Sequence, residues 1–224
     1  SSYQSWMWKR HAGFDVVTYI GKADSAGAVE IQHVPHSLGS TPEMMWVKRR
    51  DAGSGTANWF VYHKGLNGGS SPQNYHMYLN DSGSEGVDAG IWKNTAPTAT
   101  HFTVGGAYAV NQEDKNFIAL LFTSVNGISK VGYYSGQQTE LTITTGFAPR
   151  FLILRRINGA DNWWVFDTTR GWASGNNSKL LQLDSSSSES TQDFGAPTST
   201  GFTLVGDSTR TNAAGNDYIY YCHA

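Results

Sequence analysis

The chain has 224 residues, of which only 15% are charged, and its net charge is −2. This balance offers no basic surface, and no apolar stretch approaches the roughly 20 residues of a membrane helix, so we predict neither nucleic-acid binding nor membrane insertion. The single cysteine, Cys222, excludes an intramolecular disulfide framework, while 25 glycines and an aromatic content of 13% favour an all-β protein with many turns.

Short apolar and aromatic runs, bounded by Gly, Asn, Asp and Ser, predict strands along the whole chain because no helical period is sustained. The expected strands of the first half span residues 14–20, 28–34, 43–49, 58–63, 75–80, 100–104 and 116–123. Those of the second half span residues 128–134, 139–144, 150–156, 162–167, 179–184, 200–205 and 217–222. Asn158-Gly159 lies between two expected strands and predicts a hairpin turn, since both residue types tolerate positive φ.

The same motifs occur twice in the same order. Asn58-Trp59-Phe60-Val61-Tyr62 returns 104 positions later as Asn162-Trp163-Trp164-Val165-Phe166, and Ala96-Pro97-Thr98 returns 100 positions later as Ala196-Pro197-Thr198. This spacing indicates two repeats of about 105 residues. We expect a first β-sandwich repeat at 1–126, with an N-terminal boundary strand at 3–9, and a second repeat at 127–224. The joint is short, so the repeats should pack closely, either as two sandwiches or as one merged sandwich with pseudo-symmetry.

The order of several motifs resembles a known type of viral domain. Phe14-Asp15-Val16-Val17-Thr18-Tyr19 precedes His36-Ser37-Leu38-Gly39, Trp46-Val47-Lys48-Arg49 and Asn58-Trp59-Phe60-Val61-Tyr62-His63. This order is similar to that of a duplicated β-sandwich domain in tail-fibre and other virion-surface proteins of tailed bacteriophages. That domain resembles concanavalin A-like, jelly-roll lectins. The resemblance covers roughly residues 3 to 222 and implies an antiparallel, lectin-like sandwich on the extracellular surface of a virion.

Two tryptophans are candidates for ligand contact. Trp92 and Trp172 lie beside glycine in loop-like stretches and have no tryptophan at the matching repeat position. An indole face stacks on the apolar face of a sugar, while amide and cationic groups satisfy the sugar hydroxyls. We expect these rings either to contact a ligand or to fold back as lids on the core. The accompanying candidates are Lys93, Asn94, Arg170, Asn176, Asn177, Tyr75, His76 and Tyr108.

The carboxylates give little support to an enzyme. Retaining glycoside hydrolases place two carboxylates about 5 Å apart, and on one strand this requires alternate spacing such as Glu-x-Asp-x-Glu. No such triplet occurs, so we predict no catalytic residues. None of the seven histidines has a histidine at the matching repeat position, so we also predict no metal ligands and no cofactor. Calcium is the alternative that the resemblance implies, because lectin sandwiches often bind it, and it would need several oxygen ligands in one loop. Its candidates are Asp81, Glu85 and Asp88 in the first repeat, or Asp184, Glu189 and Asp193 in the second.

These features predict a non-enzymatic domain of a phage tail fibre or similar appendage that binds host cell-surface polysaccharides or other glycans. Assembly as a homotrimer, or with other virion proteins, would multiply weak sites. Two alternatives stay open. One is a purely structural or decoration domain, in which Trp92 and Trp172 are buried or lie at a subunit interface. The other is a polysaccharide depolymerase, in which two carboxyls face each other across a cleft.

Overall fold

The computed structural model describes residues 5–23, 31–51, 58–175, 178–206 and 208–224. All pairings between its named strands are antiparallel. The all-β, antiparallel class is therefore confirmed. Each strand expected between residues 14 and 222 overlaps a strand of the structure.

The first half of the chain forms one large and one small sheet. The large sheet has the order β1-β8-β3-β4-β5-β6, and β2 pairs with β7 in the small one. The strands are β1 (Phe14–Ile20), β2 (Gln32–Pro35), β3 (Met44–Arg49), β4 (Phe60–His63), β5 (Tyr75–Tyr78), β6 (Gly86–Val87), β7 (His101–Val104) and β8 (Asn116–Phe122).

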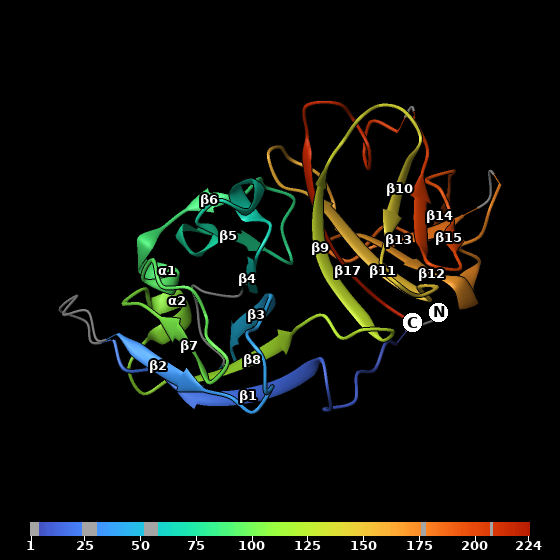
Figure 1. Ribbon diagram of the computed structural model, residues 1–224. Coiled ribbons are helices and arrows are strands. Elements are labelled where there is room, and N and C mark those ends of the chain that lie inside the picture. Colours follow the sequence, from blue (N-terminus) through green and yellow to red (C-terminus); the bar gives the residue numbers. More distant parts are fainter. Residues whose placement is uncertain (1–4, 24–30, 52–57, 176–177, 207) are drawn as a thin grey trace.

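The second half also forms one large and one small sheet. Read from its first strand, the large sheet has the order β9-β17-β11-β12-β13-β14, and the small one has the order β10-β16-β15. The strands are β9 (Ser129–Ser135), β10 (Leu141–Thr144), β11 (Phe151–Arg156), β12 (Trp164–Asp167), β13 (Lys179–Gln182), β14 (Ser190–Thr191), β15 (Pro197–Thr198), β16 (Gly201–Leu204) and β17 (Asp217–His223). Figure 1 shows this half in yellow to red beside the blue-to-green first half.

Three apolar cores hold these sheets. One lies within the first half, one within the second, and one joins the two large sheets. The sequence of β11 is apolar at successive positions and does not alternate between apolar and polar residues, because both faces of the strand are buried. Phe151 and Ile153 enter the joint core, whereas Leu152 and Leu154 enter the core of the second half. Successive side chains of a strand point to opposite faces, so a strand buried on both faces must be apolar throughout.

Hydrogen bonds to backbone carbonyls also connect the two halves. Trp163 Nε1 donates to the Tyr78 carbonyl at 2.8 Å, and the Asp161 N–H donates to the Ser82 carbonyl at 3.0 Å. The loop that follows β5 in the first half is therefore fixed against the second half. Together with the joint core, these bonds position one large sheet against the other.

Some local expectations differ from the structure. Of the boundary strand expected at 3–9, residues 3 and 4 lie outside the described residues and residues 5–9 form no strand, since Trp6 and Trp8 pack their rings against the joint core without backbone pairing. β11 and β12 form the expected hairpin, but neither Asn158 nor Gly159 has positive φ, since the connection is longer than a tight turn. Trp59 and Trp163 match in the repeats, but Trp59 is only partly buried whereas Trp163 is buried.

The helical elements are short: η1 (Leu66–Gly69), η2 (Pro72–Asn74), α1 (Ala89–Trp92), α2 (Tyr108–Asn111) and η3 (Thr168–Arg170). None of the helices in the described part of the chain has the length and apolar character needed to span a bilayer.

Candidate functional site

The two candidate loop tryptophans are core residues. Trp92 is 1% exposed and Trp172 is 3% exposed. The Trp92 Nε1 donates to the Tyr75 carbonyl at 3.0 Å, and the Trp172 Nε1 donates to the Gly195 carbonyl at 3.1 Å. Each ring covers the core of its own half, because burying an indole is favourable once its N–H has an acceptor. The prediction that these rings stack on a sugar is therefore wrong, and they act as lids.

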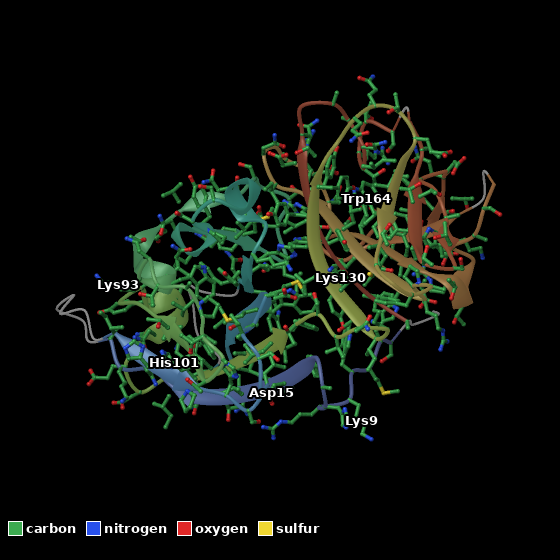
Figure 2. The ribbon with its side chains drawn as sticks, viewed as in Figure 1. Lys9, Asp15, Lys93, His101, Lys130 and Trp164 are labelled. Carbon is green, nitrogen blue, oxygen red and sulfur yellow. The ribbon has the colours of Figure 1, made fainter. Side chains whose placement is uncertain are left out.

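The other first-half candidates do not converge on one place. Tyr75 packs against the joint core, and burial lowers the pKa of the His76 imidazole. Tyr108 is exposed on α2. Lys93 and Asn94 follow α1 at positive φ, and Lys93 lies on the side of the first half that faces away from the second half (Figure 2). These five residues do not build a shared ligand site.

The second-half candidate Arg170 belongs to a surface ion-pair group. Its Nη2 lies 2.7 Å from Glu189 Oε2, and Lys179 Nζ lies 3.3 Å from Glu189 Oε1. The hydrogen bond from Arg170 holds the pKa of Glu189 below its ordinary value. Arg170 therefore orders the loop around Glu189. Asn176 and Asn177 lie outside the described residues.

The carboxylates considered as calcium ligands are dispersed. Backbone N–H groups hold Asp81, Glu85, Asp88 and Asp193, while arginines hold Asp184 and Glu189. Across the described ranges, no group of three or more His, Cys, Asp or Glu side chains could hold a metal ion. The calcium alternative thus gains no ligand cluster from the fold.

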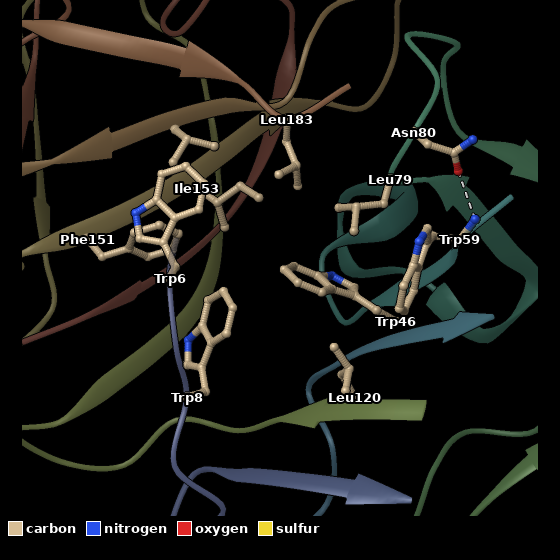
Figure 3. A pocket seen from close by; sticks show the side chains of 11 residues that line it. Trp6, Trp8, Trp46, Trp59, Leu79, Asn80, Leu120, Phe151, Ile153 and Leu183 are labelled. Atoms are coloured by element: carbon tan, nitrogen blue, oxygen red, sulfur yellow. Dashed lines mark hydrogen bonds between the residues drawn. The ribbon is translucent and has the colours of Figure 1, made fainter. Parts of the chain in front are cut away.

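A cleft of about 310 Å³ opens between the two large sheets (Figure 3). Its lining comes from three parts of the chain, and Figure 3 shows the aromatic rings directed into the space between them. The first half supplies Trp46, Trp59, Leu79, Asn80 and Leu120, the second half supplies Phe151, Ile153, Val165 and Leu183, and the N-terminal segment supplies Trp6 and Trp8. None of these lining residues carries a charge. The cleft is therefore apolar and strongly aromatic.

The N-terminal segment 5–9 forms one wall of the cleft. Trp6 Nε1 donates to Asp167 Oδ2 at 3.0 Å, and the Trp8 ring lies edge-on to Trp46 with their centres 6.1 Å apart. Met7, between them, is 90% exposed. Trp6 and Trp8 thus face inward and Met7 faces outward, as in a strand, although the segment pairs with no strand. Side-chain packing and the Asp167 contact thus hold this wall.

The cleft contains a buried donor without an acceptor. Trp46 is 5% exposed, and no described protein atom accepts a hydrogen bond from its Nε1. A buried N–H left without an acceptor costs about 1–3 kcal/mol. This nitrogen is itself buried, so a ligand in the cleft does not reach it and the cost belongs to the local packing. What the cleft offers a ligand is the apolar surface of its aromatic rings.

Asn80 and Lys48 give the cleft its polar edge. Asn80 Oδ1 accepts from the Trp59 backbone N–H at 2.8 Å, and Asn80 Nδ2 donates to Asn58 Oδ1 at 3.0 Å. Lys48 Nζ lies 5.5 Å from the centre of the Trp59 ring. Position by position, the repeat replaces Lys48 and Asn80 by Arg155 and Asp184. This difference between the repeats is the sequence signal that could have marked Trp59 as part of a site.

A smaller polar recess of about 260 Å³ adjoins the outer side of the N-terminal segment. Its lining includes Asp167, Arg150 and His223. Burial lowers the pKa of the His223 imidazole, and the nearby Arg150 charge acts in the same direction. The His223 ring also stacks on Phe151, with centres 5.0 Å apart. The recess therefore supports the wall formed by Trp6.

A family model described as a domain of unknown function (DUF7483) matches residues 3–224, so the chain belongs to that family. No curated protein and no solved structure matches the chain significantly.

Proposed function

We propose that this chain is a non-enzymatic binding module of a phage virion appendage, and that it holds host cell-surface glycans in the cleft between its two large sheets. The observation that carries the proposal is the tryptophan-lined cleft. A sugar ring offers an apolar face that stacks on an indole, and its hydroxyl groups can reach the polar edge at Asn80. The cleft volume lies at the lower end of known ligand pockets and suits one or two sugar rings.

The module is a duplicated, concanavalin A-like β-sandwich in this proposal, with repeats at 1–126 and 127–224. The identical strand order of the two large sheets supports the duplication. So does the separate core between the large and the small sheet of each half. The ligand then lies between the repeats rather than in the loops of either one.

The setting follows from the resemblance of the sequence to virion-surface domains. A single cleft of this size would bind weakly, at a Kd on the order of 0.1–1 mM. Display of several copies, as a homotrimeric fibre or with other virion proteins on the extracellular virion surface, would convert weak sites into firm attachment.

Binding to an array of bacterial surface glycans tests this function. We expect the purified chain to bind a subset of the glycans and Trp59→Ala to abolish that binding. Trp6→Ala removes a ring from the wall formed by the N-terminal segment and should weaken binding about tenfold. Trp172→Phe is the control, since it alters a core indole away from the cleft. Retained binding by a folded Trp59→Ala protein would contradict the proposal.

A structural or decoration role is the second candidate, and the burial of Trp92 and Trp172 favours it. In that case no glycan binds, and the cleft variants change only stability. Reducing ends released from the bound polysaccharides would instead indicate a depolymerase.

A further inference from the structure

Two histidines on the small sheet of the first half form a ring pair. β2 and β7 are antiparallel, with His33 opposite Thr103 and Val34 opposite Phe102. Val34 and Phe102 enter the core of this half. Because successive side chains of a strand alternate between faces, His33 and His101 share the opposite face. Their imidazole rings meet edge to face, with the ring centres 5.0 Å apart.

The second half has no histidines at the corresponding positions. Its strands β10 and β16 pair in the same register as β2 and β7, so Thr142 and Gly201 occupy the places of His33 and His101. The small sheet is therefore built twice, and only one copy carries the imidazoles. The histidine pair is thus a feature of the first half that this type of sheet does not need in order to form.

Threonine hydroxyls orient both rings through Nδ1. His33 Nδ1 lies 3.1 Å from Thr103 Oγ1, and His101 Nδ1 lies 3.1 Å from the Oγ1 atoms of both Thr98 and Thr100. The Thr98 hydroxyl directs its single proton to the His101 carbonyl at 3.0 Å, so its oxygen accepts from Nδ1. That leaves the lone pair of the His101 ring on Nε2, the form of imidazole that binds a metal. No described residue forms a hydrogen bond with Nε2 of either ring.

His36, just beyond β2, shows the contrasting arrangement. Its Nε2 contacts the Thr98 carbonyl at 3.1 Å, and its Nδ1 accepts from the Leu38 N–H at 3.3 Å. Both of its ring nitrogens are therefore used within the protein. This imidazole stabilises its loop, whereas those of His33 and His101 each keep one nitrogen for an external ligand.

The spacing of the pair suits two ligands of one metal ion. A ring nitrogen binds zinc at about 2.0–2.1 Å, and two imidazoles at roughly the tetrahedral angle then have ring centres about 5 Å apart. The observed spacing of 5.0 Å agrees with this value. His33 is exposed, so a rotation of its ring can direct its Nε2 toward an ion held by His101. Water completes the coordination, as it does at zinc sites with an open position.

We propose that His33 and His101 form a two-histidine site for a divalent transition-metal cation, Zn²⁺, Ni²⁺ or Cu²⁺. Imidazole suits these ions, whereas Mg²⁺ and Ca²⁺ prefer oxygen ligands. The ion links β2 to β7 and stabilises their two-stranded sheet. His101 lies on the side of the first half that faces away from the second half (Figure 2), so this site is separate from the cleft and does not depend on glycan binding.

Calorimetric titration of the tag-free protein with ZnCl₂ tests the site. We expect one ion per chain, with competition from Ni²⁺ and none from Mg²⁺ or Ca²⁺. His33→Gln and His101→Gln should each weaken Zn²⁺ binding at least about tenfold, since the loss of a group that merely orients a metal ligand already costs about 10–100-fold. His11→Gln is the matched control, because it removes an exposed histidine outside the small sheet and should leave the affinity unchanged.

Melting curves provide a second readout. Zn²⁺ should raise the Tm of the wild type, because binding to the folded state stabilises it, and should leave the Tm of both histidine variants unchanged. Curves recorded with a chelator verify that the variants fold. Absence of Zn²⁺ binding up to about 1 mM would overturn the site, as would equal affinity in the wild type and both variants. A stoichiometry of half an ion per chain would place the ion between two copies and would also overturn it.

Discussion

The buried Arg155–Asp184 pair yields the most specific prediction about stability. Both side chains are 0% exposed, and burial lowers the pKa of the guanidinium while the Asp184 charge opposes that shift. Arg155→Met keeps most of the packing volume but leaves Asp184 charged and buried. The carbonyls of Asp81 and Gly83 lose a donor at the same time.

The expected loss follows from these contacts. Breaking a buried ion pair by removing one partner costs about 3–5 kcal/mol, because it leaves an uncompensated buried charge. We therefore expect Arg155→Met to lose about 4 kcal/mol of unfolding free energy. For a chain of this size that corresponds to a fall in Tm of roughly 8–16 °C. Urea unfolding followed by tryptophan fluorescence measures the loss, and the exposed Arg50→Met is the control.

A second substitution separates the charge from the packing. Asp184→Asn in the Arg155→Met background removes the uncompensated carboxylate but retains an acceptor for the Trp163 N–H, as Asn80 does for Trp59. The double variant should regain about 2 kcal/mol, which is the charged part of the loss. If the free energy of unfolding of Arg155→Met lay within about 1 kcal/mol of the wild-type value, the buried pair and the bonds from Arg155 to the first half would not stabilise the protein by the expected amount.

Three further outcomes follow from single residues. Burial lowers the pKa of His63 from 6.5 to about 3 in the folded state, so the unfolded chain binds the extra proton between these values. In urea unfolding, the free energy of unfolding should therefore fall as the pH drops below 6.5, by up to about 1.4 kcal/mol per pH unit. His63→Gln should show a smaller dependence on pH, and an equal dependence in both proteins would exclude this role of His63. A Cβ at Gly195, where φ is +107°, would lie 1.9 Å from the Thr203 carbonyl oxygen, so Gly195→Ala should lower the Tm far more than Gly39→Ala, where φ is +74° and nothing lies within 4 Å. Similar melting curves for both glycine variants would contradict the steric argument. Burial raises the pKa of Cys222 to about 12, so Ellman's reagent should label the protein at pH 8 only after denaturation, and rapid labelling of the folded protein would contradict the burial.

The fold class was available from the sequence because strand signals are local. Short aromatic runs between turn residues located each predicted strand from residue 14 onward to within a few positions, whereas the boundary strand predicted at 3–9 does not form over residues 5–9. Comparison of the two repeats also paired Trp59 with Trp163. The comparison could not predict that the two tryptophans differ in burial. They have the same position in the repeat, but Trp163 is buried and Trp59 is only partly buried.

The cleft itself was decided by tertiary structure. Trp8, Trp46 and Phe151 are far apart in the sequence and meet only where the N-terminal segment enters between two large sheets. The loop tryptophans Trp92 and Trp172 were misjudged because a neighbouring glycine permits a ring to turn either outward or inward. Local sequence sets which conformations are allowed, whereas the apolar surface available nearby determines which one buries the ring.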